Sequence, residues 1–277
     1  MSFWDRLQQV DRRIIYVLII LALAIPLMSP IGIPLSYSDT TVAFYDEVSA
    51  LQAGDTVLIS LDYSPGGSAD VHPQAVTVSQ HLIQKGVKIV YVSFWDAGPM
   101  YGEQIMAPYL ERGELVYGET VTNLGYIAGG ATAIRSFGND PIGTQPTDHK
   151  GKPVASQPIM QGIKDVRDFD LVIEFISGNP GIEEWVQQGQ GPLGIKMLCG
   201  AVTVSVPKTM GYVDAGQVVG LLQGLRGAAE YEIMSGNPGS AASGMDAQSL
   251  GHIVIITFIL VGNIAYFATG GKSRKKA

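Results

Sequence analysis

Cysteine is nearly absent from this sequence, because Cys199 is the only one among 277 residues. A single cysteine forms no intramolecular disulfide, so a fold held together by cross-links is excluded and a hydrophobic core has to provide the stability. Cys199 lies in the apolar segment MLCGAV. We therefore expect a buried structural thiol there rather than a nucleophile.

Familiar catalytic and phosphate-binding motifs are missing as well. The sequence contains neither G-x-x-x-x-G-K-[ST] nor G-x-S-x-G, and no G-x-G-x-x-G follows its first predicted strand. A triad of Ser64, His149 and Asp96 is conceivable, but nothing in the sequence brings these three residues together. Asp140 and Asp148 share a loop with His149 without the spacing of zinc or calcium ligands. No catalytic residue, metal or cofactor is predicted.

Two long runs lack charge altogether, since residues 14–35 and 250–268 contain no Asp, Glu, Lys or Arg. Each run has about the 20 residues that a helix needs to cross a ~30 Å hydrocarbon layer. We predict transmembrane helices over residues 14–35 and 249–269, with tails at 1–13 and 270–277. A cleaved signal peptide is the alternative for the first run, but no A-x-A-like site follows it, which favours an uncleaved anchor.

The segment between the runs, residues 36–248, is poor in basic residues. It carries eleven Lys and Arg against 23 Asp and Glu, a net charge of −12, while the two short tails contain seven basic residues. Basic residues beside spans favour the cytoplasm, so we expect a cell-membrane protein with both tails inside and the acidic domain outside. The acidic balance argues against nucleic-acid binding.

Apolar stretches and helical segments alternate in the domain. Strands are predicted over residues 56–63, 87–95, 115–117, 171–177 and 194–206. Helices are predicted over residues 40–51, 74–85, 100–112, 130–137, 181–188 and 214–234. Continuous apolar strands without alternation are typical of parallel sheets that are covered on both faces. The predicted fold is a doubly wound, mostly parallel α/β sheet of about five strands (Rossmann-like), flanked by N- and C-terminal transmembrane helices.

Polar and glycine residues follow the predicted strands at the edge where α/β folds bind ligands. These candidate ligand residues are Asp62, Ser64, Gly66, Gly67, Asp96, Ser177 and Asn179. The alternative is that they only form turns, for which α/β loops use the same residue types. Farther along, residues 138–157 lack apolar periodicity and are predicted to be a surface or contact loop, with a lid as the alternative. Residues 235–249 are predicted to be a linker.

Small residues recur in the predicted helix 214–234. Gly216, Gly220 and Gly224 are four residues apart, and Gly227 and Ala228 follow them. Each interior glycine costs about 1 kcal/mol relative to alanine, so a stripe of them needs a close neighbour as compensation. That neighbour is either the sheet of the same domain or a second subunit.

A polar pair marks the second apolar run. His252 and Asn263 are eleven residues apart, so they share one face of a helix. An unpaired amide in an apolar span is costly, which predicts a helix–helix contact for Asn263. Its partner is the first span, an identical chain or a different membrane protein.

The favoured function is that of a two-pass, membrane-anchored extracytoplasmic α/β protein acting as a non-catalytic binding or assembly subunit. Its expected partners are the lipid bilayer and either copies of itself or other membrane subunits. The alternative is an enzyme or a small-solute sensor that uses the strand-end rim around Asp62 and Asp96. Convergence of Asp62, Asp96 and Asn179 on one pocket would distinguish this alternative.

Overall fold

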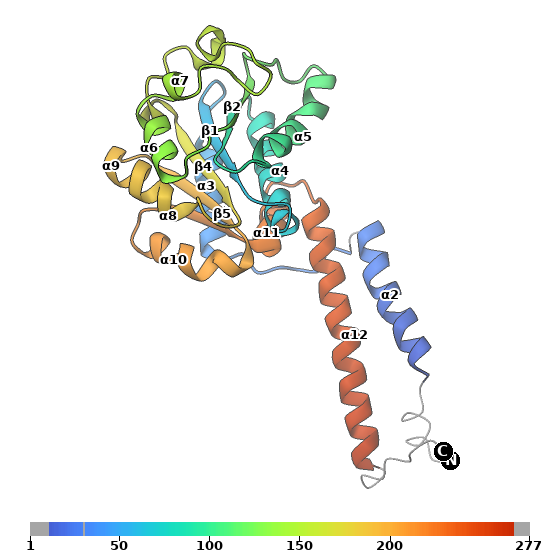
Figure 1. Ribbon diagram of the computed structural model, residues 1–277. Coiled ribbons are helices and arrows are strands. Elements are labelled where there is room, and N and C mark those ends of the chain that lie inside the picture. The colour runs from blue at the N-terminus through green and yellow to red at the C-terminus, as the bar shows by residue number, and fades with distance from the viewer. Residues whose placement is uncertain (1–10, 30, 269–277) are drawn as a thin grey trace. The chain divides into compact units, whose positions relative to one another are not determined.

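A six-stranded, all-parallel sheet forms the centre of the domain Leu35–Ala241 (Figure 1). The computed structural model describes residues 11–29 and 31–268. The strand order is β3-β2-β1-β4-β5-β6. The strands are β1 (Thr56–Asp62), β2 (Lys88–Ser93), β3 (Val121–Tyr126), β4 (Leu171–Ile176), β5 (Met197–Ala201) and β6 (Gly220–Gln223).

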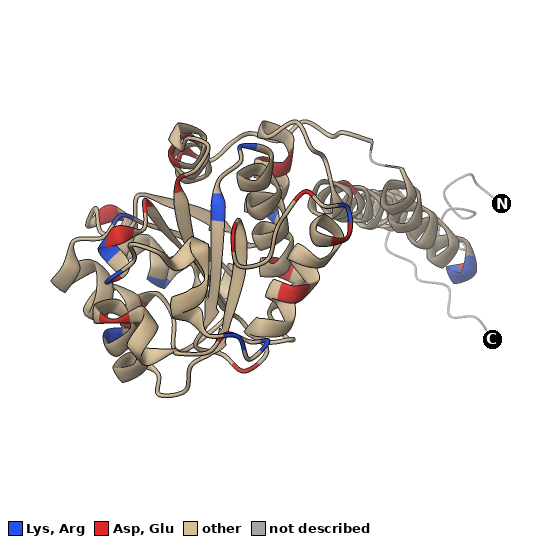
Figure 2. Ribbon diagram, turned by 90° about the horizontal axis from the view of Figure 1, so that it is seen from above, with Lys and Arg blue, Asp and Glu red and all other residues tan. Residues whose placement is uncertain are grey.

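Helices cover both faces of this sheet, as Figure 2 shows from above. The face that we call the α4 face is covered by α3 (Asp39–Ala50), α4 (Ser68–Gln84), α5 (Gly98–Glu111) and α11 (Gly224–Met234). The opposite α8 face is covered by α6 (Ala131–Asn139), α8 (Ile182–Trp185) and α10 (Val206–Asp214). Short turns of 3-10 helix at Val154–Ser156, Pro158–Met160 and Val166–Asp168 add to the α8 face. The doubly wound α/β class is thus confirmed.

The three central strands β1, β2 and β4 lie in the most apolar stretches of the domain sequence. In β1, β2 and β4 every residue after the first two is buried, because helices lie on both sides. Ser60 of β1 is in register with Val92 of β2 and Glu174 of β4. This register places a carboxyl group in the middle of the sheet.

The sheet has six strands rather than the predicted five, and two strands differ from the prediction. The third strand is Val121–Tyr126, whereas residue 117 of the predicted strand forms only a single bridge, to Val121. The sequence VTNLGY of β3 mixes Thr, Asn and Gly with apolar residues, so no continuous apolar run marks it. The sixth strand, β6, was predicted to be helical.

The predicted helix over residues 214–234 is wrong, and with it the stripe of small residues. Gly216 lies in a turn with a φ of 71°, Gly220 begins β6, and Gly224 begins α11 with a φ of 55°. Only Gly227 and Ala228 lie inside a helix. A short apolar run such as VVGLLQ fits a buried strand as well as a helix, and the positive φ angles that glycine permits break the predicted helix.

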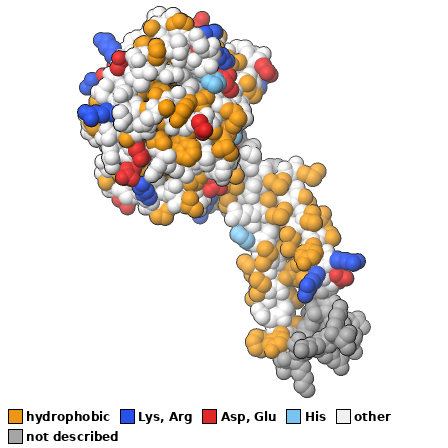
Figure 3. Space-filling view, in the orientation of Figure 1, with side chains coloured by type: hydrophobic (Ala, Val, Ile, Leu, Met, Phe, Trp, Pro, Cys, Tyr) orange, Lys and Arg blue, Asp and Glu red, His pale blue; other side chains and the backbone are white. Residues whose placement is uncertain are grey.

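The second compact unit combines Met1–Pro34 with Ala242–Ala277. It contains α2 (Arg12–Met28, 17 residues) and most of α12 (Ser240–Ala268, 29 residues). By length and composition, α12 is the one helix in the described chain that is long and apolar enough to cross a membrane, with a mean hydropathy of 2.0 over an 18-residue window. Hydrophobic side chains cover much of the surface of both helices (Figure 3).

The first predicted span is shorter than expected. Helix α2 ends at Met28, and residues 31–38 are not helical, so the two-span prediction has one described candidate rather than two. The predicted linker 235–249 is also wrong over residues 240–249, because α12 begins at Ser240. Most of the predicted tails, residues 1–10 and 270–277, lie outside the described residues.

One carboxylate organises the end of this unit. Asp246 of α12 accepts hydrogen bonds from the backbone N–H groups of Ile31, Gly32 and Ile33, at 2.8, 2.8 and 3.0 Å. Farther along α12, the side chains of His252 and Asn263 are exposed. The expected helix–helix contact of Asn263 therefore stays a prediction.

Candidate functional site

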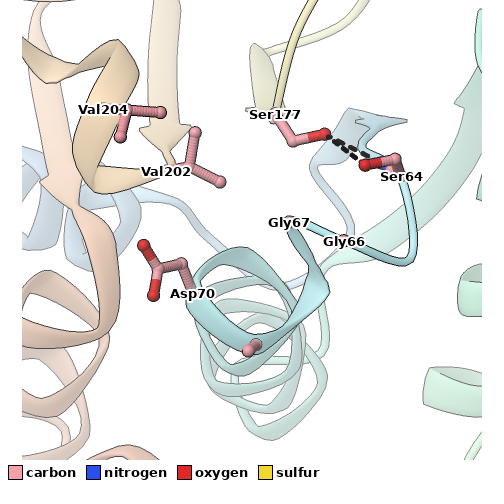
Figure 4. A pocket seen from close by; sticks show the side chains of 8 residues that line it. Ser64, Gly66, Gly67, Asp70, Ser177, Val202 and Val204 are labelled. Carbon is pink, nitrogen blue, oxygen red and sulfur yellow. Dashed lines mark hydrogen bonds between the residues drawn. The ribbon is translucent and has the colours of Figure 1, made fainter.

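An open pocket of about 370 Å³ lies at the carboxyl edge of the sheet (Figure 4). It is bounded by the loop after β1, the first turn of α4 and the segments that follow β4 and β5. Strand order reverses between β1 and β4, so the pocket occupies the switch point of the doubly wound sheet. Its lining residues are Ser64, Gly66, Gly67, Ala69, Asp70, Ser177, Val202 and Val204.

The floor of the pocket depends on a close approach of two loops. Ser177 Oγ accepts a hydrogen bond from the backbone N–H of Ser64 at 2.8 Å and donates one to Ser64 Oγ at 3.3 Å. A Cβ atom at Gly67 would lie 2.4 Å from Cβ of Ser177, which is closer than side chains pack. Glycine is therefore required at position 67 for the loops to meet.

Asp70 supplies the only ionisable side chain among the eight lining residues. Its Oδ2 atom accepts hydrogen bonds from the backbone N–H of Thr203 at 3.1 Å and from Thr203 Oγ1 at 2.9 Å. No Lys, Arg or His within the described residues forms an ion pair with Asp70. The carboxylate is thus held in place by Thr203 and left without a countercharge.

Asp62 was expected at the rim, but it lies below the surface on the α8 face. It is fully buried and accepts hydrogen bonds from Ser60 Oγ at 2.5 Å and from the backbone N–H of Phe94 at 2.6 Å. Longer hydrogen bonds come from Ser93 Oγ and Trp185 Nε1. Burial raises the pKa of Asp62 to about 6, although these hydrogen bonds act to lower it.

A second buried carboxyl group, Glu174, was not predicted. It lies in β4 between Ser60 of β1 and Cys199 of β5, and neither of its carboxyl oxygens has a hydrogen-bond partner within the described residues. Burial raises the pKa of Glu174 well above its usual value, and the charges of Asp62 and Glu184 raise it further. The one available signal was a glutamate in the middle of the buried strand LVIEFI.

Cys199 is fully buried, as expected for a structural thiol. Burial raises the pKa of its thiol well above the usual value, and the charge of Glu174 adds to this shift. A thiol in that environment stays protonated and has no access to solvent.

Asp96 and Asn179, which were also expected at the rim, do not line the switch-point pocket. Asp96 is exposed. Asn179 lines a separate cavity of about 50 Å³, which is also lined by Lys208 and Glu183, and these two residues form an ion pair. Asp62, Asp96 and Asn179 therefore do not converge on one pocket, so the geometry gives no support to the alternative of an enzyme or small-solute sensor that uses the rim around Asp62 and Asp96.

The segment 138–157 is structured and takes no part in the pocket. It contains α7 (Pro141–Thr144), and Asp148 accepts hydrogen bonds from the backbone N–H groups of Lys150 and Lys152 and from Gln157 Nε2. None of its residues lines the switch-point pocket. The described residues also contain no group of three or more His, Cys, Asp or Glu side chains placed to hold a metal ion.

No family model, curated protein sequence or solved structure matches this chain.

Proposed function

We propose that this chain is a membrane-anchored protein whose α/β domain binds a small polar solute in the switch-point pocket. In this proposal it serves as the non-catalytic binding subunit of a membrane complex. The position of the pocket carries the proposal, because open α/β sheets bind their ligands where strand order reverses. A volume of about 370 Å³ lies within the usual range for small-molecule sites.

The lining chemistry supports binding more than catalysis. The pocket offers two serine hydroxyls, one carboxylate and backbone groups, together with two valine side chains. Activation of a serine nucleophile requires a general base within hydrogen-bonding distance, and Ser64 and Ser177 hydrogen-bond to each other instead. Such a set of groups holds and orients a solute.

The proposed membrane anchoring is supported by α12, which is long and apolar enough to cross a membrane. The proposal takes the shorter helix α2 as a second span, and it uses the distribution of charge to orient both. Four basic residues follow α12 in the sequence, and Arg12 and Arg13 begin α2. By the positive-inside rule these ends are cytoplasmic and the domain is extracytoplasmic. Labelling of single cysteines in intact cells with an impermeant thiol reagent tests this. Position 149 should react, position 274 should react only after lysis, and the reverse pattern contradicts the topology.

Filling the pocket tests the binding function. Ala69 is exposed on the first turn of α4 and lines the pocket, so Ala69→Trp should occupy it without disturbing the core. Thermal unfolding of the full chain in detergent, measured with a panel of small polar solutes, should identify solutes that stabilise the wild type and not this variant. Ala50→Trp, at the opposite edge of the sheet, is the matched control. A panel in which no solute distinguishes Ala69→Trp from the wild type contradicts the proposal.

Assembly is tested separately by mass measurement after gentle detergent extraction. We expect the chain to be recovered with further subunits, either identical or different. Recovery as a single chain would contradict a role as a subunit of a membrane complex.

A further inference from the structure

The carboxylate of Asp70, at one side of the switch-point pocket, forms no ion pair with the described residues. Both hydrogen bonds from Thr203 go to Oδ2 of Asp70, and no donor in the described part of the chain bonds to Oδ1. The remaining seven lining residues are uncharged. A bound cation would supply the countercharge that this carboxylate lacks.

The other side of the pocket offers hydrogen-bond donors. Ser64 Oγ accepts from Ser177 Oγ, so its own proton is free to donate. The backbone N–H of Gly66 has no acceptor among the described residues either. In Figure 4 the Ser64–Ser177 pair and Asp70 lie on opposite sides of Gly67. The pocket therefore has an acceptor side and a donor side.

Two valines complete the lining. Val202 is buried and lies beside Asp70 in the close-up, and Val204 is 86% exposed at the start of the next segment (Figure 4). Their side chains offer apolar surface to the carbon skeleton of a ligand, which a fully polar pocket would not. The combination suits a small organic molecule better than a hydrated metal ion.

On the basis of the proposed binding function, we infer that the solute is a small amine that also carries a hydroxyl or carboxylate oxygen, as amino alcohols and amino acids do. Its ammonium group donates to Asp70, in a charge-assisted hydrogen bond. Its oxygen accepts from the Ser64 hydroxyl and the Gly66 N–H. Val202 and Val204 contact the carbon atoms between these two groups.

Isothermal titration of the full chain in detergent tests this inference with two pairs of probes. Ethanolamine and β-alanine carry the required amine, while ethylene glycol and propionate are counterparts without it. We expect both amines to bind and both counterparts to fail. Ser64→Ala removes one donor on the opposite side and should weaken binding of the amines several-fold.

Asp70→Asn is the decisive variant. Because both Thr203 hydrogen bonds reach the same oxygen, the amide oxygen of asparagine keeps them while the charge is lost. Affinity for the amines should fall about tenfold or more. Asp46→Asn makes the same charge change at an exposed position of α3 and should leave affinity unchanged.

The outcomes separate the ligand class from the binding function. Amine affinity that is unchanged in Asp70→Asn overturns the inference. Binding of ethylene glycol or propionate alone, abolished by Ala69→Trp, overturns the amine and retains the binding function. A wild type that binds neither these probes nor any other solute of the panel overturns both.

Discussion

The two faces of the sheet bury carboxyl groups in opposite ways. On the α4 face, Glu230 of α11 accepts hydrogen bonds from the backbone N–H and Oγ of Ser38 and pairs with Arg226. On the α8 face, Glu174 has no hydrogen-bond partner among the described residues, and the negative charge of Asp62 acts on it. A buried carboxyl group is stable as an anion only where donors and a cation surround it. The two faces are therefore expected to differ in their charge state and in their response to pH.

The pKa directions express this difference. Burial acts to raise the pKa of Glu230, but the hydrogen bonds from Ser38, Thr41 and Arg226 outweigh it and lower the pKa. Burial raises the pKa of both Asp62 and Glu174, and their mutual repulsion adds to the shift of Glu174. The α4 face thus lowers the pKa of Glu230, and the α8 face raises the pKa values of Asp62 and Glu174.

Two glycines differ in the space that an added side chain would have: Gly220 on the α4 face and the exposed Gly211 of α10. At Gly220 of β6, an added Cβ would lie 2.5 Å from the backbone nitrogen of Phe44 in α3, whereas nothing lies within 4 Å of the same position at Gly211 of α10. We expect Gly220→Ala to destabilise the domain by about 3 kcal/mol or more, because backbone has to move. Chemical denaturation measures this loss. Gly211→Ala, inside a helix, should be neutral or stabilise by up to about 1 kcal/mol, and equal effects would remove this contrast.

The pH dependence of stability should reveal Asp62. Its pKa in the folded protein is raised from 3.8 to about 6, so its favourable contribution is complete below 3.8 and is lost as the pH rises through about 6. The loss corresponds to about 3 kcal/mol. Denaturant unfolding across this range, compared with Asp62→Asn, measures it. A wild-type profile that is parallel to that of the variant would contradict the shift.

Replacing Glu174 should stabilise the domain. Glu174→Met has a similar volume and removes a buried carboxyl group without partners, so we expect a gain of about 1–3 kcal/mol at neutral pH. The gain should grow as the pH rises. Because the pKa of Glu174 is raised in the folded protein, the contribution of Glu174 to the free energy of unfolding falls with increasing pH, and the variant does not share this loss. Thermal or denaturant unfolding at several pH values checks this. Destabilisation by Glu174→Met would instead show that the carboxyl group has an essential partner.

Glu230→Gln should have the smallest of these effects and, unlike Glu174→Met, should destabilise the domain. The amide keeps an acceptor for Ser38 but loses the ion pair with the partly exposed Arg226, which costs about 1 kcal/mol at neutral pH. Because the pKa of Glu230 is lowered, its contribution is present above the ordinary pKa of glutamate and is lost as the pH falls. Wild type and variant should converge in acid, and a difference that widens there would contradict this assignment.

Strands with a strong local sequence pattern were predicted, and strands without one were missed. The cores of β1, β2 and β4 were predicted because each is a continuous apolar run followed by turn residues. Strands β3 and β6 were missed because their sequences, VTNLGY and GLLQ, give no period that separates a strand from a helix or a loop. The number of strands and the order of the sheet depend on pairing between distant segments.

The candidate site was predicted in part. The rule that ligands bind at the carboxyl ends of parallel strands pointed to Ser64, Gly66, Gly67 and Ser177, and these four residues line one pocket. Asp62 also follows that rule in sequence, but strand alternation turns its side chain into the α8 face. Asp70 was missed because it lies in the first turn of α4, where an acidic residue is ordinary.

The sequence by itself determined the alternation of strands and helices, the apolar character of α12 and the burial of Cys199, because these follow from local composition and period. Tertiary structure alone decided which carboxyl groups are paired and which are not. Glu174 and Glu230 are both glutamates within buried segments, and the one local difference is Arg226, four residues before Glu230, which forms an ion pair with it. Their charge states depend on which donors the fold places beside them: for Glu230 these come from Ser38, nearly two hundred residues away in sequence, while Glu174 has none among the described residues.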